Sequence, residues 1–151
     1  MSDERPFQAL VDEWLDACHT FFAALDALPA DCRERAGVCG VWNPRQVVAH
    51  LAGWHYEAIR RYAEIMAGDA DKTYDTDAFN AVQVEAREHL TWEQTLDDLR
   101  EAVDILRMQA RDLPEHLATV EPRYAAWLEG LTRDLREHLQ QVRGWLPPAP
   151  G

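Results

Sequence analysis

The sequence predicts an all-α protein, a four-helix bundle with a long crossover between its second and third helices. Three observations support this prediction. Apolar residues recur at steps of three and four in four long segments, and each of these segments ends at a proline or a glycine. No window alternates between apolar and polar residues as a half-buried β-strand does.

The first two helices are predicted over residues 4–28 and 43–68. Aromatic and aliphatic side chains form a continuous helical stripe in the first segment, which Pro29 ends. Asn43 suits the start of the second helix because its side chain accepts hydrogen bonds from free backbone amides. Pro44 then takes the first helical position, where the missing N–H costs no hydrogen bond.

The second half of the chain opens with a polar stretch, residues 68–76, which predicts the crossing loop. Asp77 is expected to cap a short helix over Phe79–His89. Thr91 and Gln94 have the spacing of a capping box, so the third long helix is predicted to begin there.

The third long helix is predicted to end at Pro114. The fourth runs from Pro122 to a point before Pro147. We expect one domain over residues 1–146, followed by a Pro-rich tail at residues 147–151.

The composition limits the classes of function. The 151 residues carry a formal charge of −12 with a pI near 4.8, which argues against nucleic-acid binding because phosphates need clustered Lys and Arg. No run approaches the roughly 20 apolar residues that span a bilayer, so no membrane partner is predicted. The acidic start predicts no signal peptide, and three cysteines without a CxxC pair favour a reducing cytoplasm. This balance fits a protein with a small-molecule ligand.

The second helix places a histidine where the helix should be apolar. His50 lies three residues after Val47 and four before Trp54, so its imidazole points inward with that stripe. A buried polar ring left without a partner costs a few kcal/mol. The partner of His50 therefore bears on what the protein does.

The fourth helix offers that partner. Asp134 and His138 are four residues apart and share one face, among leucines. Together with His50 they would supply two imidazoles and one carboxylate to a divalent metal with at least one open position. Zn²⁺ or Ni²⁺ suits this ligand set best, and Fe²⁺ and Mn²⁺ are compatible with the same ligand types. The alternative is a core histidine bonded to a backbone carbonyl, with Asp134 an ordinary surface acid.

Three parts of the chain resemble the DinB/YfiT-like superfamily. They are the segment GVWNPRQVVAHLAGWHYEAIRRY, the long acidic middle, and TRDLREHLQQV near the end. The ClbS/DfsB branch, with a similar WxxxxxxxHLxxW signature, is the closest branch. The resemblance covers most of the chain in helix order, and the second-helix motif is its most specific part.

The resemblance implies a DinB-like bundle, often a homodimer, that holds a metal through one second-helix histidine and two residues of the last helix. On this chain those positions are His50, Asp134 and His138. Many members carry histidine where this chain has Asp134, and the related mycothiol-dependent maleylpyruvate isomerases are similar to it in using an acidic residue. Members include transferases and isomerases that use low-molecular-weight thiols. ClbS-like members instead protect cells against a genotoxic metabolite, and some lack the metal histidines.

The substrate side of the site is predicted from three further residues. Trp54 and Trp127 lie one or two turns from the predicted ligands and either wall a substrate pocket or pack in the core. Asn80 resembles a polar position near the pocket of ClbS-like sequences. His55 falls on another face of the second helix and is predicted to be exposed. No catalytic residue is assigned, and a Ser or Cys nucleophile has no support.

These observations lead to one functional hypothesis and two alternatives. The first is a metal-dependent enzyme that activates a thiol or water toward a small electrophile, as a thiol transferase, isomerase or hydrolase, with a low-molecular-weight thiol as possible co-substrate. The second is a ClbS-like protective protein that binds and inactivates a small electrophile. The third is a metal-free bundle that serves as an interaction module.

Overall fold

The computed structural model describes residues 6–145, and this part of the chain is helical and without β-strands. The helices are α1 (Pro6–Asp26), α2 (Pro44–Met66), α3 (Thr76–Ala86), α4 (Trp92–Asp112), α5 (Glu115–Val120) and α6 (Pro122–Trp145), with a short 3-10 helix, η1 (Ala30–Cys32), after α1. The prediction of an all-α protein is confirmed. The predicted Pro-rich tail lies outside the described residues.

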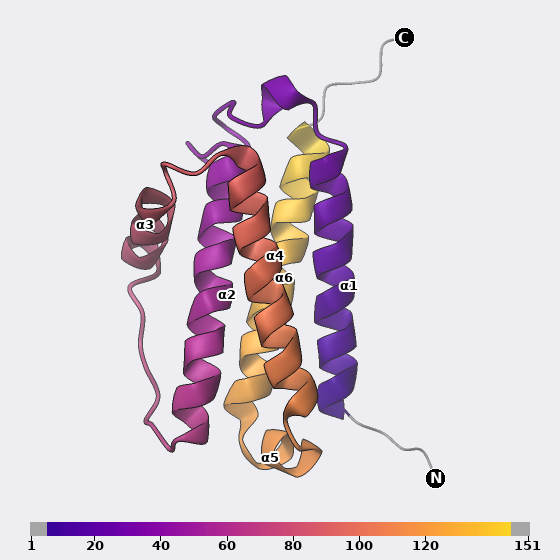
Figure 1. Cartoon of the computed structure of the whole chain (residues 1–151), viewed down its shortest axis with the longest axis vertical. Helices are drawn as coiled ribbons and strands as arrows, with labels where there is room; N and C mark the ends of the chain where they lie inside the picture. Colours follow the sequence, from indigo (N-terminus) through magenta and orange to yellow (C-terminus); the bar gives the residue numbers. More distant parts are fainter. Residues whose placement is uncertain (1–5, 146–151) are drawn as a thin grey trace.

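The four long helices α1, α2, α4 and α6 lie side by side (Figure 1). Helices α1 and α6 run in one direction, and α2 and α4 run in the other. Because α2 and α4 are parallel, the connection between them returns along the length of the molecule. That connection carries α3, which packs on the outer side of α2.

Two details of the chain between the long helices differ from the prediction. The cap of α3 is Asp75, whose carboxylate accepts from the Ala78 amide, and Asp77 lies in the first turn instead. Helix α5 was not predicted, because six residues between two prolines are too few to show a helical period.

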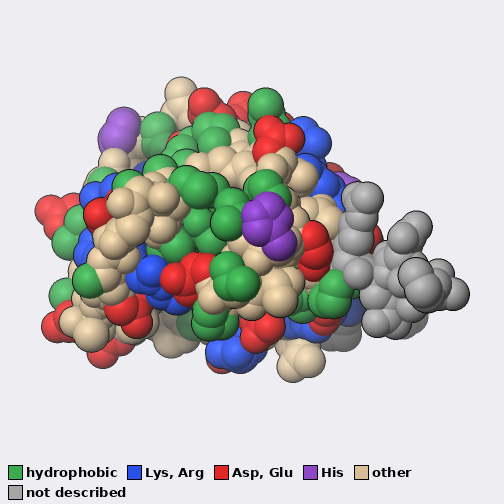
Figure 2. Space-filling view, turned by 90° about the horizontal axis from the view of Figure 1, so that it is seen from below, with side chains coloured by type: hydrophobic (Ala, Val, Ile, Leu, Met, Phe, Trp, Pro, Cys, Tyr) green, Lys and Arg blue, Asp and Glu red, His purple; other side chains and the backbone are tan. Residues whose placement is uncertain are grey.

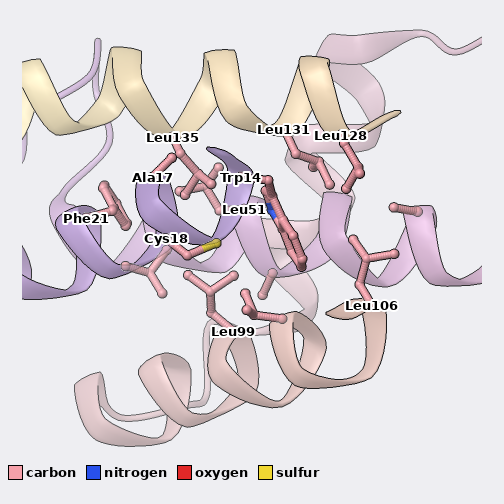
Figure 3. Packing of buried hydrophobic residues seen from close by; sticks show 14 of the residues in the cluster. Trp14, Ala17, Cys18, Phe21, Leu51, Leu99, Leu106, Leu128, Leu131 and Leu135 are labelled. Carbon is pink, nitrogen blue, oxygen red and sulfur yellow. The ribbon is translucent and has the colours of Figure 1, made fainter. Parts of the chain in front are cut away.

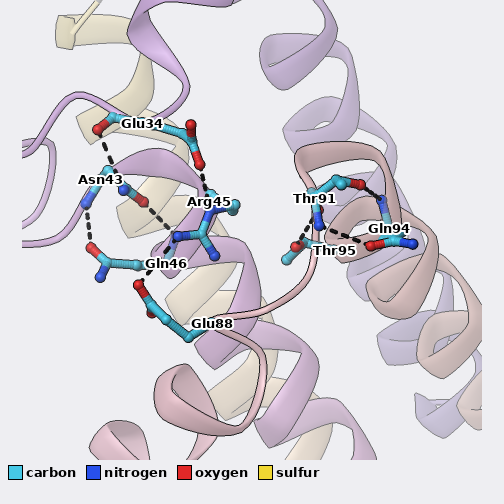
Figure 4. A network of polar contacts seen from close by, with 8 residues as sticks. All are labelled: Glu34, Asn43, Arg45, Gln46, Glu88, Thr91, Gln94 and Thr95. Atoms are coloured by element: carbon cyan, nitrogen blue, oxygen red, sulfur yellow. Dashed lines mark hydrogen bonds and ion pairs between the residues drawn. The ribbon is translucent and has the colours of Figure 1, made fainter.

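The capping box predicted at Thr91 is present, and the predicted cap at Asn43 is a second capping box (Figure 4). The Asn43 side chain accepts from the Gln46 amide at 2.8 Å, and the Gln46 side chain accepts from the Asn43 amide at 2.9 Å. Thr91 and Gln94 make the same reciprocal pair at the start of α4, at 3.1 and 2.9 Å. These contacts fix where α2 and α4 begin and thereby fix the register of their inward faces.

A buried arginine ties the start of α2 to its neighbours (Figure 4). Arg45 donates to Glu34 at 3.0 Å in the preceding loop and to Glu88 at 3.5 Å, just after α3. The crossing segment is therefore anchored to α2 at the end where α4 begins.

The core lies between the four long helices (Figure 3). Trp14 and Phe21 of α1 meet leucines from each of the other three long helices, and all these side chains are almost fully buried. The leucines are Leu51 of α2, Leu99 and Leu106 of α4, and Leu128 and Leu135 of α6.

His55 is fully buried, so the prediction that it is exposed was wrong. Its Nδ1 lies 2.7 Å from the Leu51 carbonyl oxygen, which can only accept, and the Trp14 indole donates to its Nε2 at 3.1 Å. Neutral His55 thus satisfies both ring nitrogens inside the core. Local periodicity could not predict this burial, because the partner indole is on another helix.

The surface mixes both signs of charge. The end of the molecule that carries α5, seen in Figure 2, shows acidic and basic side chains interspersed with apolar ones. Across residues 6–145, no helix combines the length and the apolarity that crossing a membrane requires.

The contact between α2 and α3 requires a glycine. A Cβ built on Gly53 would lie 2.3 Å from Gln83 Cγ and 2.6 Å from Gln83 Cβ. We therefore expect Gly53→Ala to lower the free energy of unfolding by about 1–3 kcal/mol, although alanine favours helix. Gly130→Ala is the matched control, because nothing lies within 4 Å of its added Cβ. Urea unfolding measures both, and a Gly53→Ala variant as stable as Gly130→Ala would contradict this packing.

The burial of His55 makes stability depend on pH. Burial lowers the pKa of His55 from 6.5 to about 4. Below pH 6.5 the unfolded chain binds a proton that the folded chain does not. The free energy of unfolding should thus fall between about pH 6.5 and 4, by roughly 3 kcal/mol from this residue.

Urea unfolding at pH 7 and pH 4.5 checks this. The double variant Trp14→Phe/His55→Leu, which removes donor and acceptor together, should lose less stability in acid than the unmodified protein. His19→Ala, at an exposed site, should leave the slope unchanged. An unaltered acid loss in the double variant would contradict the assignment.

Candidate functional site

A cavity of about 610 Å³ opens between α2, α6 and the crossing segment that carries α3. All six residues that the sequence singled out line it: His50, Trp54, Asn80, Trp127, Asp134 and His138. They come from three helices and are up to 88 positions apart in the chain. The packing of α6 and α3 against α2 brings them to one place.

The two histidines meet at the inner wall of this cavity. His50 Nε2 lies 2.9 Å from His138 Nε2, and the rings meet edge to face with centroids 4.9 Å apart. Both residues are more than nine-tenths buried. His50 therefore has a side-chain partner across the bundle, and the alternative of a histidine bonded to a backbone carbonyl describes His55 instead.

The other ring nitrogen of His50 faces Asn80. The Trp54 indole, which can only donate, is 2.7 Å from Asn80 Oδ1, so this atom is an acceptor. His50 Nδ1, 3.2 Å from the same oxygen, must then carry the proton and donate. In the neutral ring this leaves a lone pair on His50 Nε2.

His138 is held in the same way by Gln141. Its Nδ1 lies 2.6 Å from Gln141 Oε1. An amide oxygen can only accept, so His138 Nδ1 donates to it, and a lone pair remains on His138 Nε2 in the neutral ring.

The consequence is that two imidazole lone pairs point at each other across 2.9 Å. Such a contact repels unless a positive centre, a proton or a cation, lies between the two nitrogens. Burial and the nearby His138 together lower the pKa of His50 to about 3, although the bond to Asn80 opposes the shift. His50 therefore holds a proton only weakly near neutral pH.

Asp134 lies in the same cavity but not in the same contact. It is half-buried on α6, one turn before His138. Burial raises the pKa of its carboxyl, whereas His138 lowers it. Within residues 6–145, no three His, Cys, Asp or Glu side chains gather closely enough to hold a metal ion. The structure thus brings the two histidines together and leaves the carboxylate nearby.

Aromatic rings form the wall beyond the histidines. Trp54 lies 6.1 Å from Trp127, 4.1 Å from Phe79 and 5.3 Å from Tyr74, measured between ring centroids. Trp54 and Trp127 are half-buried and line the cavity, so they are more than core residues. Phe79 and Tyr74 come from the crossing segment and pack against them.

Residues of this site that sequence reasoning missed include Trp42, Tyr74, Cys39 and Gln141. Gln141 follows His138 by three positions, the spacing of helical neighbours, and this signal was available. Trp42, whose ring centroid is 5.0 Å from that of His50, precedes the predicted cap. Tyr74 and Cys39 lie in loops, where no periodicity indicates direction.

Comparisons of the chain with protein-family models, with curated proteins and with solved structures give no match. The molecule is thus defined by its own features, an all-helical fold and a cavity with two facing histidines.

The contact between Asn80 and His50 allows a test of the inferred protonation state, in which neutral His50 carries its proton on Nδ1. With metal removed by a chelator, His50 should stay neutral at pH 5 in the unmodified protein. Asn80→Asp puts a carboxylate against Nδ1 and should raise the pKa of His50 by about 1–3 pH units. Imidazole ¹⁵N NMR reports this titration. A His50 that is already protonated at pH 5 in the unmodified protein would contradict this protonation state.

Proposed function

We propose that the chain is a DinB-like four-helix bundle that binds a divalent metal and activates a thiol or water toward a small electrophile. The observation that carries this proposal is the pair of imidazole lone pairs facing each other in the cavity. A cation relieves their repulsion, and burial makes a proton a poor substitute.

The surroundings of the two rings support a metal site. Ligating histidines commonly donate their second ring N–H to an oxygen, which fixes the ring and its tautomer. Asn80 and Gln141 supply such oxygens to His50 and His138. His50, His138 and Asp134 would hold the metal, with Zn²⁺ or Ni²⁺ preferred by this mixture of imidazole and carboxylate.

The chain's own residues would prepare the reaction. A divalent metal lowers the pKa of a thiol or water that it coordinates. Trp54 and Trp127 exclude bulk water from one side, and Asn80 holds both the His50 ring and the Trp54 indole in place. Thiol transfer and hydrolysis are both compatible with this arrangement, with a low-molecular-weight thiol as co-substrate of the former. Assembly as a homodimer in the cytoplasm belongs to the same proposal.

A protective binding protein is the second candidate. Two observations favour it: an aromatic wall beside an open cavity, and the lack of a three-donor cluster among residues 6–145. A protein of this kind would bind and inactivate an electrophile without a metal.

Elemental analysis and zinc or nickel titration of untagged protein test the first proposal. One divalent ion per chain is expected, lost in both His50→Ala and His138→Ala and retained in the control His19→Ala. Asp134→Asn should weaken binding by about 10-fold or more if the carboxylate is a ligand. Protein that folds but binds neither metal would overturn the proposal and favour the second candidate.

Turnover separates the remaining possibilities. Metal-loaded protein is given 1-chloro-2,4-dinitrobenzene with a low-molecular-weight thiol, and separately 4-nitrophenyl acetate without thiol. Thiol-dependent turnover lost in His50→Ala indicates transfer, and thiol-independent turnover indicates hydrolysis. Stoichiometric reaction without turnover would indicate a protective role.

A further inference from the structure

We propose that the cavity takes an elongated anionic ligand, with an apolar aromatic body and an anionic group bound by Arg61, Lys72 and Arg123. These cations lie at the end of the cavity away from the histidines. This ligand class would be the substrate class of the proposed function. The inference rests on that function in one respect only, namely that the histidine end of the cavity is the reactive end.

The order of side chains along two helices gives the cavity its length. On α2 the cavity-lining residues run from His50 through Trp54 to Arg61, and on the antiparallel α6 they run from His138 to Trp127 and Arg123. Arg61 follows His50 by eleven positions on the same helix, which corresponds to about 16 Å along the helix axis. The cavity is thus an elongated slot with imidazoles toward one end and guanidinium groups toward the other.

The far end of this slot is fixed by hydrogen bonds. The Tyr62 hydroxyl donates to the Tyr124 carbonyl oxygen at 2.7 Å and holds α2 against α6 there. Arg61 donates to the Ala70 carbonyl oxygen at 3.0 Å, and Arg123 donates to that of Asp69 at 3.1 Å. Neutral carbonyls orient the two guanidinium groups without cancelling their charge.

The acidic partners of these cations lie outside the cavity lining. Lys72 pairs with Glu57, Arg123 with Glu121, and Arg61 with Glu64, but none of the three glutamates lines the cavity. The three cations thus line the slot themselves, while the glutamates that pair with them do not.

Among the residues that line the cavity, cations outnumber carboxylates, and the glutamates that pair with three of these cations lie outside the lining. Four cations, Arg61, Lys72, Arg123 and Arg133, line the cavity against two carboxylates, Asp71 and Asp134. The chain as a whole has a formal charge of −12. Local cations in a cleft of low-dielectric walls attract an anion that the rest of this acidic surface repels.

The aromatic rings between the two ends select the body of the ligand. Tyr74 lies 6.0 Å from Trp127 and 5.3 Å from Trp54 between ring centroids, and all three line the cavity. Planar apolar groups pack well on such a wall. A short inorganic anion would contact the cations and leave this wall empty.

A matched pair of fluorescent probes tests the proposal on chelator-treated, metal-free protein. 8-Anilinonaphthalene-1-sulfonate is the anionic probe, and N-phenyl-1-naphthylamine is the same ring system without the sulfonate. We expect the sulfonate to bind about 10-fold more tightly, a ratio typical of one charge-assisted contact, and to lose this advantage at high salt.

Substitutions of the cavity cations test where the sulfonate group of the probe binds. Arg123→Gln and Lys72→Gln, both at partly exposed side chains, should each weaken sulfonate binding at least about fivefold and leave the neutral probe unchanged. Arg107→Gln, an exposed cation on α4 outside the cavity lining, is the control and should change neither probe.

Equal affinity for the two probes, or sulfonate binding that survives both variants, would overturn this inference. Either result leaves the metal titration untouched, because the probe experiment uses metal-free protein. Conversely, sulfonate selectivity in a protein that binds no metal would support the anion site and remove the proposed metal chemistry.

Discussion

The contact between His50 and His138 is the constraint on which the site depends. It joins the two helices that carry most of the cavity lining, and it does so with two buried imidazoles whose Nε2 atoms are 2.9 Å apart. Apolar packing would join α2 and α6 at lower cost, since a buried lone pair without a donor loses its hydration. The core elsewhere is mostly apolar, and its other buried histidine, His55, has a hydrogen-bond partner for each ring nitrogen. A repulsive contact kept in place by Asn80 and Gln141 is therefore better explained by a function than by stability.

The helix directions explain why the site has a third wall. Helices α2 and α4 are parallel, so the chain must travel back along α2, a helix of 23 residues and about 35 Å, before α4 begins. This return brings Tyr74, Phe79 and Asn80 over α2. Gly53 allows α3 to come close enough for the Asn80 side chain to reach His50. The connection between two helices thus supplies the oxygen that sets the tautomer of a ring on one of them.

The sequence predicted the helical class, the cap at Asn43, the capping box at Thr91 and a set of six residues that share one cavity. These predictions succeeded because they depend on local periodicity, which determines the inward face of each helix. Periodicity does not tell which inward side chains meet across helices. His55 was wrongly placed outside for this reason, since its burial depends on the Trp14 indole of α1. Tyr74 was missed because its position is set by a bond to Glu57, 17 residues earlier in the chain.

Asp134 shows what the helical spacing of two residues can predict and what it cannot. Four residues place it on the same face as His138, and the structure keeps it in the cavity, but sharing a face does not make two side chains converge on one point. Its carboxyl is half-buried with a raised pKa, so it gains little from its present surroundings as an anion. A cation beside His138 would reverse that balance, because it would favour the charged carboxylate as well as both imidazole lone pairs. Under the proposed function, one bound cation would therefore favour the charged carboxylate and both lone pairs at the same time.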